Sequence, residues 1–467
     1  MKYAALGLGF LLLVYVCMVF FTLQRTPTIS VDYTAKLNEA AAAIPENERA
    51  WPLYRTAGIA LNKNSEPTPE IDGRYVTPTW VGDPGWDTYG VWLELHDETL
   101  DLIREGTTKA GVGYINSNQI AEEDKELWPE EYEKTRGNAE NLFFKMWFPQ
   151  LSEMRRMARL LKFDAVDAAS EGDGGRCFQD IQAIIHLGIH TQEHSTLIND
   201  LVAMSLYNIA FQTIGIILEK TPEVLTPEFE NVKKMLVSLD TEFDVRFEGE
   251  RMFILDFLQQ TFTDDGNGDG KPVPGKLLEM MATLSETATA DYTVLLAPLG
   301  DLFIASRKES LDHYDEYLAQ MEKYRDVPLF EWDNAVLAFH EKFESRLGDT
   351  FMNKYYLLDF LTPTLDRAML AGNYTRATRD GLLATLYAIE IHQSTGQWPT
   401  DLSLAGVVDP WTGEPWRIAM VEAHPIIYSI GTDRKDDGGK FHSKAKEWCS
   451  SGTDIPDGDW VIWPNPE

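Results

Sequence analysis

The chain begins with a long uncharged apolar segment. Between Lys2 and Arg25 lie 22 uncharged residues, and a helix of that length, rising about 1.5 Å per residue, would cross the roughly 30 Å hydrocarbon core of a bilayer. A cleaved signal peptide has a shorter apolar run that ends in small residues, whereas arginine, threonine and proline follow this one. The pattern therefore predicts a membrane anchor over residues 1–25, with residues 3–24 in the lipid.

The next part of the chain, residues 26–369, has the periodicity of amphipathic helices. Two apolar-periodic runs flank Glu171–Gly175, a glycine-rich segment that can form a tight helix–helix turn. A third run, over Ser195–Lys220, starts at a residue suited to cap a helix. Further helices are predicted over Pro227–Leu239, Glu242–Phe262, Gly275–Leu284, Ser306–Lys323 and Glu331–Leu347. The pattern predicts a multi-helix body.

The last part of the chain, residues 370–467, has a different pattern. A helix with an apolar stripe is predicted over Arg376–Gln393. Three short β-rich runs follow it, at Trp416–Val421, Ile426–Ile430 and Asp459–Trp463. The expected fold class is therefore mainly α: an N-terminal transmembrane helix, a helical body, and a C-terminal α+β module in which one helix packs on a three-stranded antiparallel sheet.

Composition narrows the possible functions. Lys plus Arg number 41 against 74 for Asp plus Glu, a formal net charge of -33, which would repel nucleic acid over most of the surface. We therefore expect no nucleic-acid partner. The sequence has no G-x-S-x-G nucleophile elbow and no G-x-G-x-x-G motif after a strand, so we expect no enzyme activity. The pairing of Cys177 and Cys449 stays open.

One acidic segment has the spacing of a calcium-binding loop. Asp265, Asn267 and Asp269 stand at positions one, three and five of an EF-hand-like loop, with Gly270 at position six. The loop departs from that pattern at position twelve, where Lys276 replaces the expected glutamate. The segment is therefore either a weak Ca²⁺ site or a polar linker between two helices.

Aromatic residues mark the segment from Ser65 to Gly90, which has many prolines, glycines and aspartates and no helical period. Trp80, Trp86 and Tyr89 could form a stacking platform for a sugar, because aromatic faces bind apolar ring surfaces. The alternative is that these rings hold the segment against the helical body.

Three histidines recur at a spacing of four residues. His186, His190 and His194 would lie about one helical turn apart, and two imidazoles at this spacing suit Zn²⁺. A complete site needs further ligands that no local spacing supplies. The competing interpretation is that these histidines pack between helices or face solvent.

Several segments resemble a group of uncharacterised bacterial envelope proteins. These segments are AWPLYRTAGIAL, HLGIHTQEHSTLINDLVAMSL and FEGERMFILDFLQQTF. Members of the group combine a membrane anchor, a helical body and a DP-x-TG-x-P tail, which here is Asp409–Pro415. The resemblance implies this architecture.

The tail carries a second resemblance. GQWPTDL, VVDPWTGEPW and YSIGTDRKDDGG follow one another in the order seen in the soluble part of the major pseudopilin of type II secretion systems. That resemblance implies that the bulk of the chain lies on the periplasmic side of the inner membrane. It also implies a Ca²⁺ site, and by position its carboxylates would be Asp433, Asp436 and Asp437. This chain lacks the prepilin-peptidase site of pseudopilins, and about 350 residues separate its anchor from the tail, so the tail resembles a borrowed module.

These features together predict a single-pass membrane-anchored envelope protein that acts as a binding or scaffolding component. The expected partners are other envelope proteins or cell-wall glycan. The alternative is a periplasmic glycan-binding or glycan-hydrolysing protein, because two catalytic carboxylates can be distant in sequence and close in space.

Overall fold

The structure is a computed structural model that describes most of the chain. The described residues are 2–137, 142–239, 241–284, 304–325, 327–332, 354–355, 358, 361, 365–421, 424–443, 445 and 458–464. The protein is mainly helical with a small three-stranded antiparallel sheet near the C-terminus, which confirms the predicted fold class. Most of the predicted helix Glu331–Leu347 lies outside the described residues, as does Cys449.

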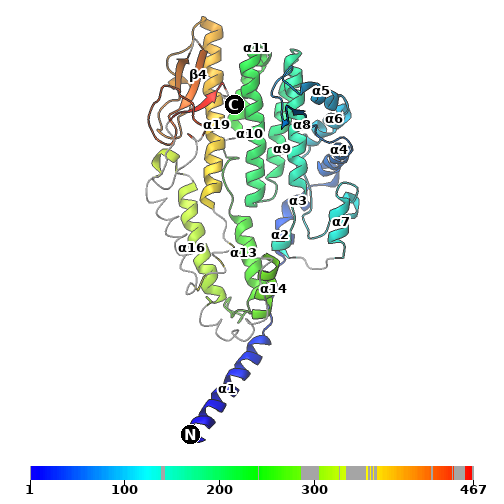
Figure 1. The fold of residues 1–467 in the computed structure, drawn as a ribbon, viewed down its shortest axis with the longest axis vertical. Coiled ribbons are helices and arrows are strands. Elements are labelled where there is room, and N and C mark those ends of the chain that lie inside the picture. The colour runs from blue at the N-terminus through cyan, green and yellow to red at the C-terminus, as the bar shows by residue number, and fades with distance from the viewer. Residues whose placement is uncertain are drawn as a thin grey trace.

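Three long helices form the centre of the body (Figure 1): α8 (Gln150–Ser170), α9 (Gly174–Thr191) and α10 (Leu197–Lys220). Each packs along the other two. The turn between α8 and α9 contains Gly172 at a φ of +80°, a conformation that favours glycine. The predicted helical hairpin is therefore confirmed.

The start of α10 differs by one position from the prediction. Thr196, not Ser195, is the N-cap, and its side-chain oxygen accepts a hydrogen bond from the Asn199 N–H at 3.4 Å. The carbonyl of Ser195 instead accepts the Gly249 N–H at 2.8 Å, from the first turn of α13 (Glu248–Thr261). Ser195 therefore joins two helices rather than capping one.

Helix α10 has no wide polar face. Its length and hydropathy would suit a membrane crossing, but most of its side chains are buried inside the protein. It lies between α8 and α9 on one side and α19 (Leu365–Thr395) on the other. A helix that is apolar on all sides is stable in water only when other elements cover it.

A second layer covers the outer side of α8 and α9. It consists of α4 (Trp51–Lys63), α5 (Trp86–Glu94), α6 (Asp97–Thr107) and α7 (Pro129–Thr135). This layer packs on α8 through aromatic side chains such as Tyr89 of α5, whose ring lies 4.1 Å from the Phe163 ring, measured between centroids. Aromatic side chains bury large apolar areas, so they account for much of the cohesion between the two layers.

A buried ionic group also links these layers. Arg104 of α6 donates from Nε to Asp180 of α9 at 2.7 Å, and its guanidinium also pairs with Asp164 of α8. Asp180 is fully buried, and its pKa is raised by burial and by the neighbouring Asp164 carboxyl. One cation thus faces two carboxyl groups, and it ties α6 to both helices of the hairpin.

The other α-helices described in the body are α2 (Tyr33–Leu37), α3 (Glu39–Ala43), α11 (Pro222–Leu225), α12 (Phe229–Ser238), α13, α14 (Pro274–Leu284) and α16 (Arg307–Arg325). Of these, α13 and α14 lie at the base of the body, the end from which α1 extends, whereas α11 lies at the opposite end (Figure 1). A two-stranded hairpin, β1 (Glu70–Ile71) and β2 (Arg74–Tyr75), lies in the Ser65–Gly90 segment. The predicted helix Glu242–Phe262 begins late, at Glu248, because turns and extended residues precede it.

The C-terminal sheet has the order β3–β4–β5 and is antiparallel throughout. Its strands are β3 (Arg417–Val421), β4 (His424–Ser429) and β5 (Trp460–Trp463). Helix α19 covers it, and Gly381 of that helix lies close enough to β5 that a Cβ there would be 2.8 Å from the Ile462 side chain. The helix is longer than predicted, because its first turns also pack on α10 and α16.

Helix α1 (Lys2–Leu23) extends away from the rest of the protein (Figure 1). Its described side chains, from Phe10 to Leu23, form an apolar stretch that is largely exposed, and Phe21 is 72% exposed. Just after the helix, Arg25 donates a hydrogen bond to the Pro272 carbonyl at 3.2 Å, next to α14. The base of the body therefore holds the end of an apolar helix that nothing else in the described residues covers.

The close approach of α13 to the α9–α10 connection can be tested with one methyl group. A Cβ at Gly249 would collide with the Ser195 carbonyl, whereas Gly275, near the start of α14, has open space around it. We expect Gly249→Ala to lower the free energy of unfolding by about 1–3 kcal/mol through overpacking, and Gly275→Ala to leave it equal or higher because glycine weakens helices. Urea unfolding measures both; equal effects would contradict the described contact.

Candidate functional site

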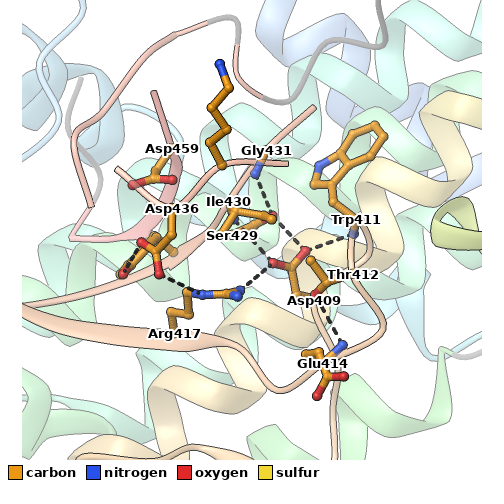
Figure 2. Close-up of polar contacts among 12 residues, drawn as sticks. Asp409, Trp411, Thr412, Glu414, Arg417, Ser429, Ile430, Gly431, Asp436 and Asp459 are labelled. Carbon is orange, nitrogen blue, oxygen red and sulfur yellow. Dashed lines mark hydrogen bonds and ion pairs between the residues drawn. The ribbon is translucent and has the colours of Figure 1, made fainter. Parts of the chain in front are cut away.

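The strongest polar cluster lies where the tail sheet meets the loop before β3 (Figure 2). Asp409 is fully buried and accepts hydrogen bonds from the Trp411 N–H at 2.8 Å, the Ser429 hydroxyl at 2.8 Å and the Ile430 N–H at 3.2 Å. Burial raises the pKa of Asp409, while these donors act to lower it. Asp409 therefore fixes the Asp409–Pro415 turn onto strand β4.

Arg417 connects this buried carboxylate to the acidic loop after β4. Its guanidinium lies 3.4 Å from Asp409 Oδ2 and donates from Nε to Asp436 Oδ2 at 3.1 Å. Asp436 also accepts hydrogen bonds from the Tyr428 hydroxyl and the Gly438 N–H, both at 3.0 Å. Partial burial acts to raise the pKa of Asp436, but these hydrogen bonds and the positive charge of Arg417 lower it overall.

The other two predicted calcium ligands lie differently. Asp433 has a nearly buried side chain; its Oδ1 accepts the Lys435 N–H at 2.9 Å, and its Oδ2 is buried without a hydrogen-bond partner among the described residues. Asp437 is exposed, and its N–H lies 3.4 Å from the carboxylate of Asp459. Asp459, at the start of β5, also accepts the Gly439 N–H at 2.6 Å.

The three predicted ligands are thus in one loop but in three environments. Asp436 is held by an arginine, Asp433 is buried with one unpartnered oxygen, and Asp437 faces solvent. Sequence reasoning missed Arg417 and Asp459, whose side chains bind Asp436 and the Gly439 N–H of the loop. Arg417 is the first residue of β3 and Asp459 is the last residue before β5. Because both strands pair with β4, the predicted strand pairing could have indicated that Arg417 and Asp459 lie beside the loop that follows β4.

The EF-hand-like segment forms a compact turn between α13 and α14. Asp265 Oδ1 accepts the N–H groups of Asn267 at 2.8 Å and Asp269 at 3.2 Å. The carboxylate of Asp269 accepts the Lys308 N–H at 3.1 Å in the first turn of α16, and a hydrogen bond from the Ser306 hydroxyl lowers its pKa. The polar residues here close a turn and cap a helix.

No group of three or more His, Cys, Asp or Glu side chains arranged to hold a metal ion occurs in the described part of the chain. Lys276, at the position where an EF-hand would have its last ligand, lies in α14 and pairs with Glu279 at 2.9 Å.

Two of the three histidines, His190 and His194, are buried, whereas His186 is partly exposed. His190 Nε2 donates to the Lys109 carbonyl at 3.1 Å, which leaves Nδ1 to accept the Tyr54 hydroxyl at 2.9 Å. Burial lowers the pKa of His190 to about 4, and burial together with the charge of Arg246 lowers the pKa of His194 to about 4. Both nitrogens of His190 are occupied, so the packing interpretation holds for this residue and zinc binding there would break two hydrogen bonds.

The aromatic residues of the Ser65–Gly90 segment face inward. Trp86 and Tyr89 are buried, and the Tyr89 ring lies 4.1 Å from the Phe163 ring of α8, measured between centroids. Trp80 is partly buried against the same core. The idea of a sugar-stacking platform built from these three rings is therefore wrong, since the faces a sugar would use contact the protein's own core.

Comparisons of this chain with protein families, with curated protein sequences and with solved structures found no match.

The buried state of His190 predicts a pH dependence. Since its pKa is depressed in the folded protein, its contribution to stability is complete above the ordinary pKa of about 6.5 and is lost as the pH falls toward 4. We expect the free energy of unfolding of the native chain to fall between pH 7 and pH 5 by about 2 kcal/mol more than that of His190→Gln.

Urea unfolding at the two pH values measures this difference. His424→Gln, which changes an exposed histidine on β4, serves as the matched control and should behave like the native chain. An identical pH dependence in the native chain and His190→Gln would show that His190 takes up a proton without opposition.

Proposed function

We propose that this protein is a single-pass membrane-anchored envelope protein in which α1 holds a helical body at the membrane surface for binding or scaffolding. The observation that carries the proposal is the exposed apolar helix α1, which projects from the base of the body. Exposed apolar side chains along a whole helix are unfavourable in water and favourable in lipid.

The junction between anchor and body supports this arrangement. Arg25 binds the Pro272 carbonyl just after α1 ends, and a cation at this point would lie in the headgroup region, where arginine is favourable. We place the body on the periplasmic side of the inner membrane, as the resemblance of the tail to the pseudopilin implies. Its partners would be other envelope proteins or cell-wall glycan.

A role in binding or scaffolding, rather than catalysis, is supported by the surroundings of the aromatic and carboxyl side chains that could have formed a glycan site. The rings that could have lined a sugar groove pack into the core, and the buried carboxyl pair of Asp164 and Asp180 is engaged with Arg104. The tail, which we propose to be a pseudopilin-like module, adds an exposed three-stranded sheet whose outer strand β3 carries exposed apolar residues.

Calcium binding at the tail loop is a second candidate function. One observation favours it: Asp433 Oδ2 is buried and lacks a hydrogen-bond partner among the described residues, with the Lys435 ammonium no nearer than 4.0 Å. Such an oxygen is a hard ligand of the type that Ca²⁺ prefers. Asp436 would have to exchange Arg417 for the ion.

The anchor is tested by two charges in α1. Leu12→Arg combined with Val16→Arg should move the protein from the membrane to the soluble fraction, because each charge at the centre of a membrane helix costs about 2.5–3.5 kcal/mol. Alkaline carbonate extraction of membranes measures the distribution. Leu404→Arg with Val408→Arg, the same residue types and spacing at exposed positions of the tail, is the control and should stay with the membrane.

Release of the native chain by carbonate would refute the anchor, and so would equal retention of the native and α1-substituted chains.

Calcium binding is tested by thermal unfolding. Calcium should raise the Tm of the native chain, by a stabilisation of about 2.7 kcal/mol when its concentration is 100 times Kd, and Asp433→Asn should abolish the rise. Asp265→Asn, in the EF-hand-like segment, is the matched comparison and should keep it. A rise that survives Asp433→Asn but disappears in Asp265→Asn would move the site to that segment, and no rise in the native chain would exclude both.

A further inference from the structure

A cavity of about 450 Å³ lies at the base of the body, beside the point where α1 joins it. Its walls come from residues 27–33, from the 3-10 turn η3 (Phe143–Lys145), and from α13 and α14. Figure 1 shows α2, α13 and α14 gathered at this end of the body, directly above α1. The volume falls within the range of about 300–1,000 Å³ typical of small-molecule sites.

The walls of this basal cavity are fixed by hydrogen bonds to one pair of residues on α13. Gln259 Oε1 accepts the N–H groups of Ser30 at 3.1 Å and Val31 at 3.2 Å, and its Nε2 donates to the Val31 carbonyl at 2.7 Å. Gln259 also donates to Asp256 Oδ1 at 2.8 Å, and Asp256 Oδ2 accepts the Phe143 N–H at 3.1 Å. Specific hydrogen bonds therefore hold the walls of the cavity in place.

The lining combines an apolar interior with charges of both signs. Apolar side chains come from the chain before α2, from the start of η3 and from α14, and they are Pro27, Ile29, Val31, Leu142 and Met280, whereas α13 contributes Asp256 and Gln260. Lys145 and Lys276 supply two positive charges, and Lys276 lies 2.9 Å from the carboxylate of Glu279, which is also part of the lining. Asp32 adds an exposed carboxylate. A ligand suited to this surface has an apolar part and a headgroup with both a negative and a positive charge.

The position of the cavity indicates where such a ligand would come from. Helix α1 ends at Leu23 and the cavity wall begins at Pro27, and four residues of chain span at most about 14 Å. In a chain anchored by α1, the cavity therefore lies at the depth of the lipid headgroups. This step rests on the membrane anchoring proposed above.

We propose that the basal cavity binds one zwitterionic phospholipid that bears a primary ammonium group. Its phosphate lies near Lys145 and Lys276, and its ammonium group lies near Asp32 and Glu279. Part of one acyl chain lies against the apolar side chains of the interior. A purely anionic lipid would face the carboxyl groups of Asp32, Asp256 and Glu279 without bringing a positive charge of its own, and in a protein with a net charge of -33 that repulsion is substantial.

The proposal is tested by native mass spectrometry of the full chain in detergent micelles supplied with dioleoyl phosphatidylethanolamine or dioleoyl phosphatidylglycerol. We expect one phosphatidylethanolamine per chain, bound about tenfold more tightly than phosphatidylglycerol, a difference of about 1.4 kcal/mol. Lys145→Glu with Lys276→Glu should weaken its binding at least tenfold. Lys271→Glu, at the same end of the body but outside the cavity lining, is the control and should bind as the native chain does.

A second variant tests lipid binding without changing any charge in the cavity. Val31→Trp would fill part of the cavity while leaving the backbone hydrogen bonds to Gln259 in place, and it should exclude the lipid. Circular dichroism checks that each variant is folded. Free phosphoethanolamine should fail to displace the lipid at equal concentration, because the apolar interior supplies part of the affinity.

Equal lipid binding by the native chain, the double lysine variant and Val31→Trp would overturn the proposal. Equal affinity for both lipids would overturn the assignment to a zwitterionic headgroup, and displacement by phosphoethanolamine would make the ligand a soluble one. These results are separate from the anchoring itself, since lipid binding in micelles is measured whether or not carbonate extracts the chain from membranes.

Discussion

The burial of helix α10 is the constraint on which the rest of the structure depends. This helix has the hydropathy of a membrane span, yet it lies inside the body with most of its side chains covered. Each large apolar side chain that is removed from water contributes about 1.5–3 kcal/mol, so leaving one face of α10 open would be strongly unfavourable. Its neighbours α8, α9 and α19 are therefore the minimum that a water-exposed body requires.

This requirement also explains how the tail is attached. One face of helix α19 packs on α10, and another face of the same helix packs on the sheet β3–β5. Because one helix serves both surfaces, the tail module is continuous with the body rather than joined to it by a linker. The buried carboxylate of Asp409 then fixes the turn before β3 to strand β4, and Arg417 extends this network to the acidic loop.

Two long apolar helices therefore have opposite surroundings. Helix α10 is covered by protein, whereas α1 extends from the base with its apolar side chains exposed. The account of function depends on this contrast, since lipid is the medium that would cover α1. The basal cavity lies where these two environments meet, and its charged lining and apolar interior are those expected of a site between headgroups and protein.

Much of the fold was predictable from local pattern. The α8–α9 hairpin follows from periodicity on both sides of a glycine-rich turn, and the three tail strands follow from short β-rich runs. The site was less predictable, because its contacts join distant positions: Asp409 with Ser429, and Asp256 with Phe143. Burial of Trp86 and Tyr89 depends on Phe163 of α8, which no local spacing could indicate. Local pattern specifies elements, but tertiary packing decides which polar and aromatic groups remain accessible.

The most direct test of the account is to measure which apolar helix contacts lipid. A bimane label is attached to Cys17 in α1, or to Ile209→Cys in α10 with Cys17→Ser, in full-length chains lacking Cys177 and Cys449 and reconstituted into vesicles whose acyl chains carry a quencher. The account predicts strong quenching of the label at position 17 and little at position 209. An unquenched label at position 17, or strong quenching at position 209, would contradict it.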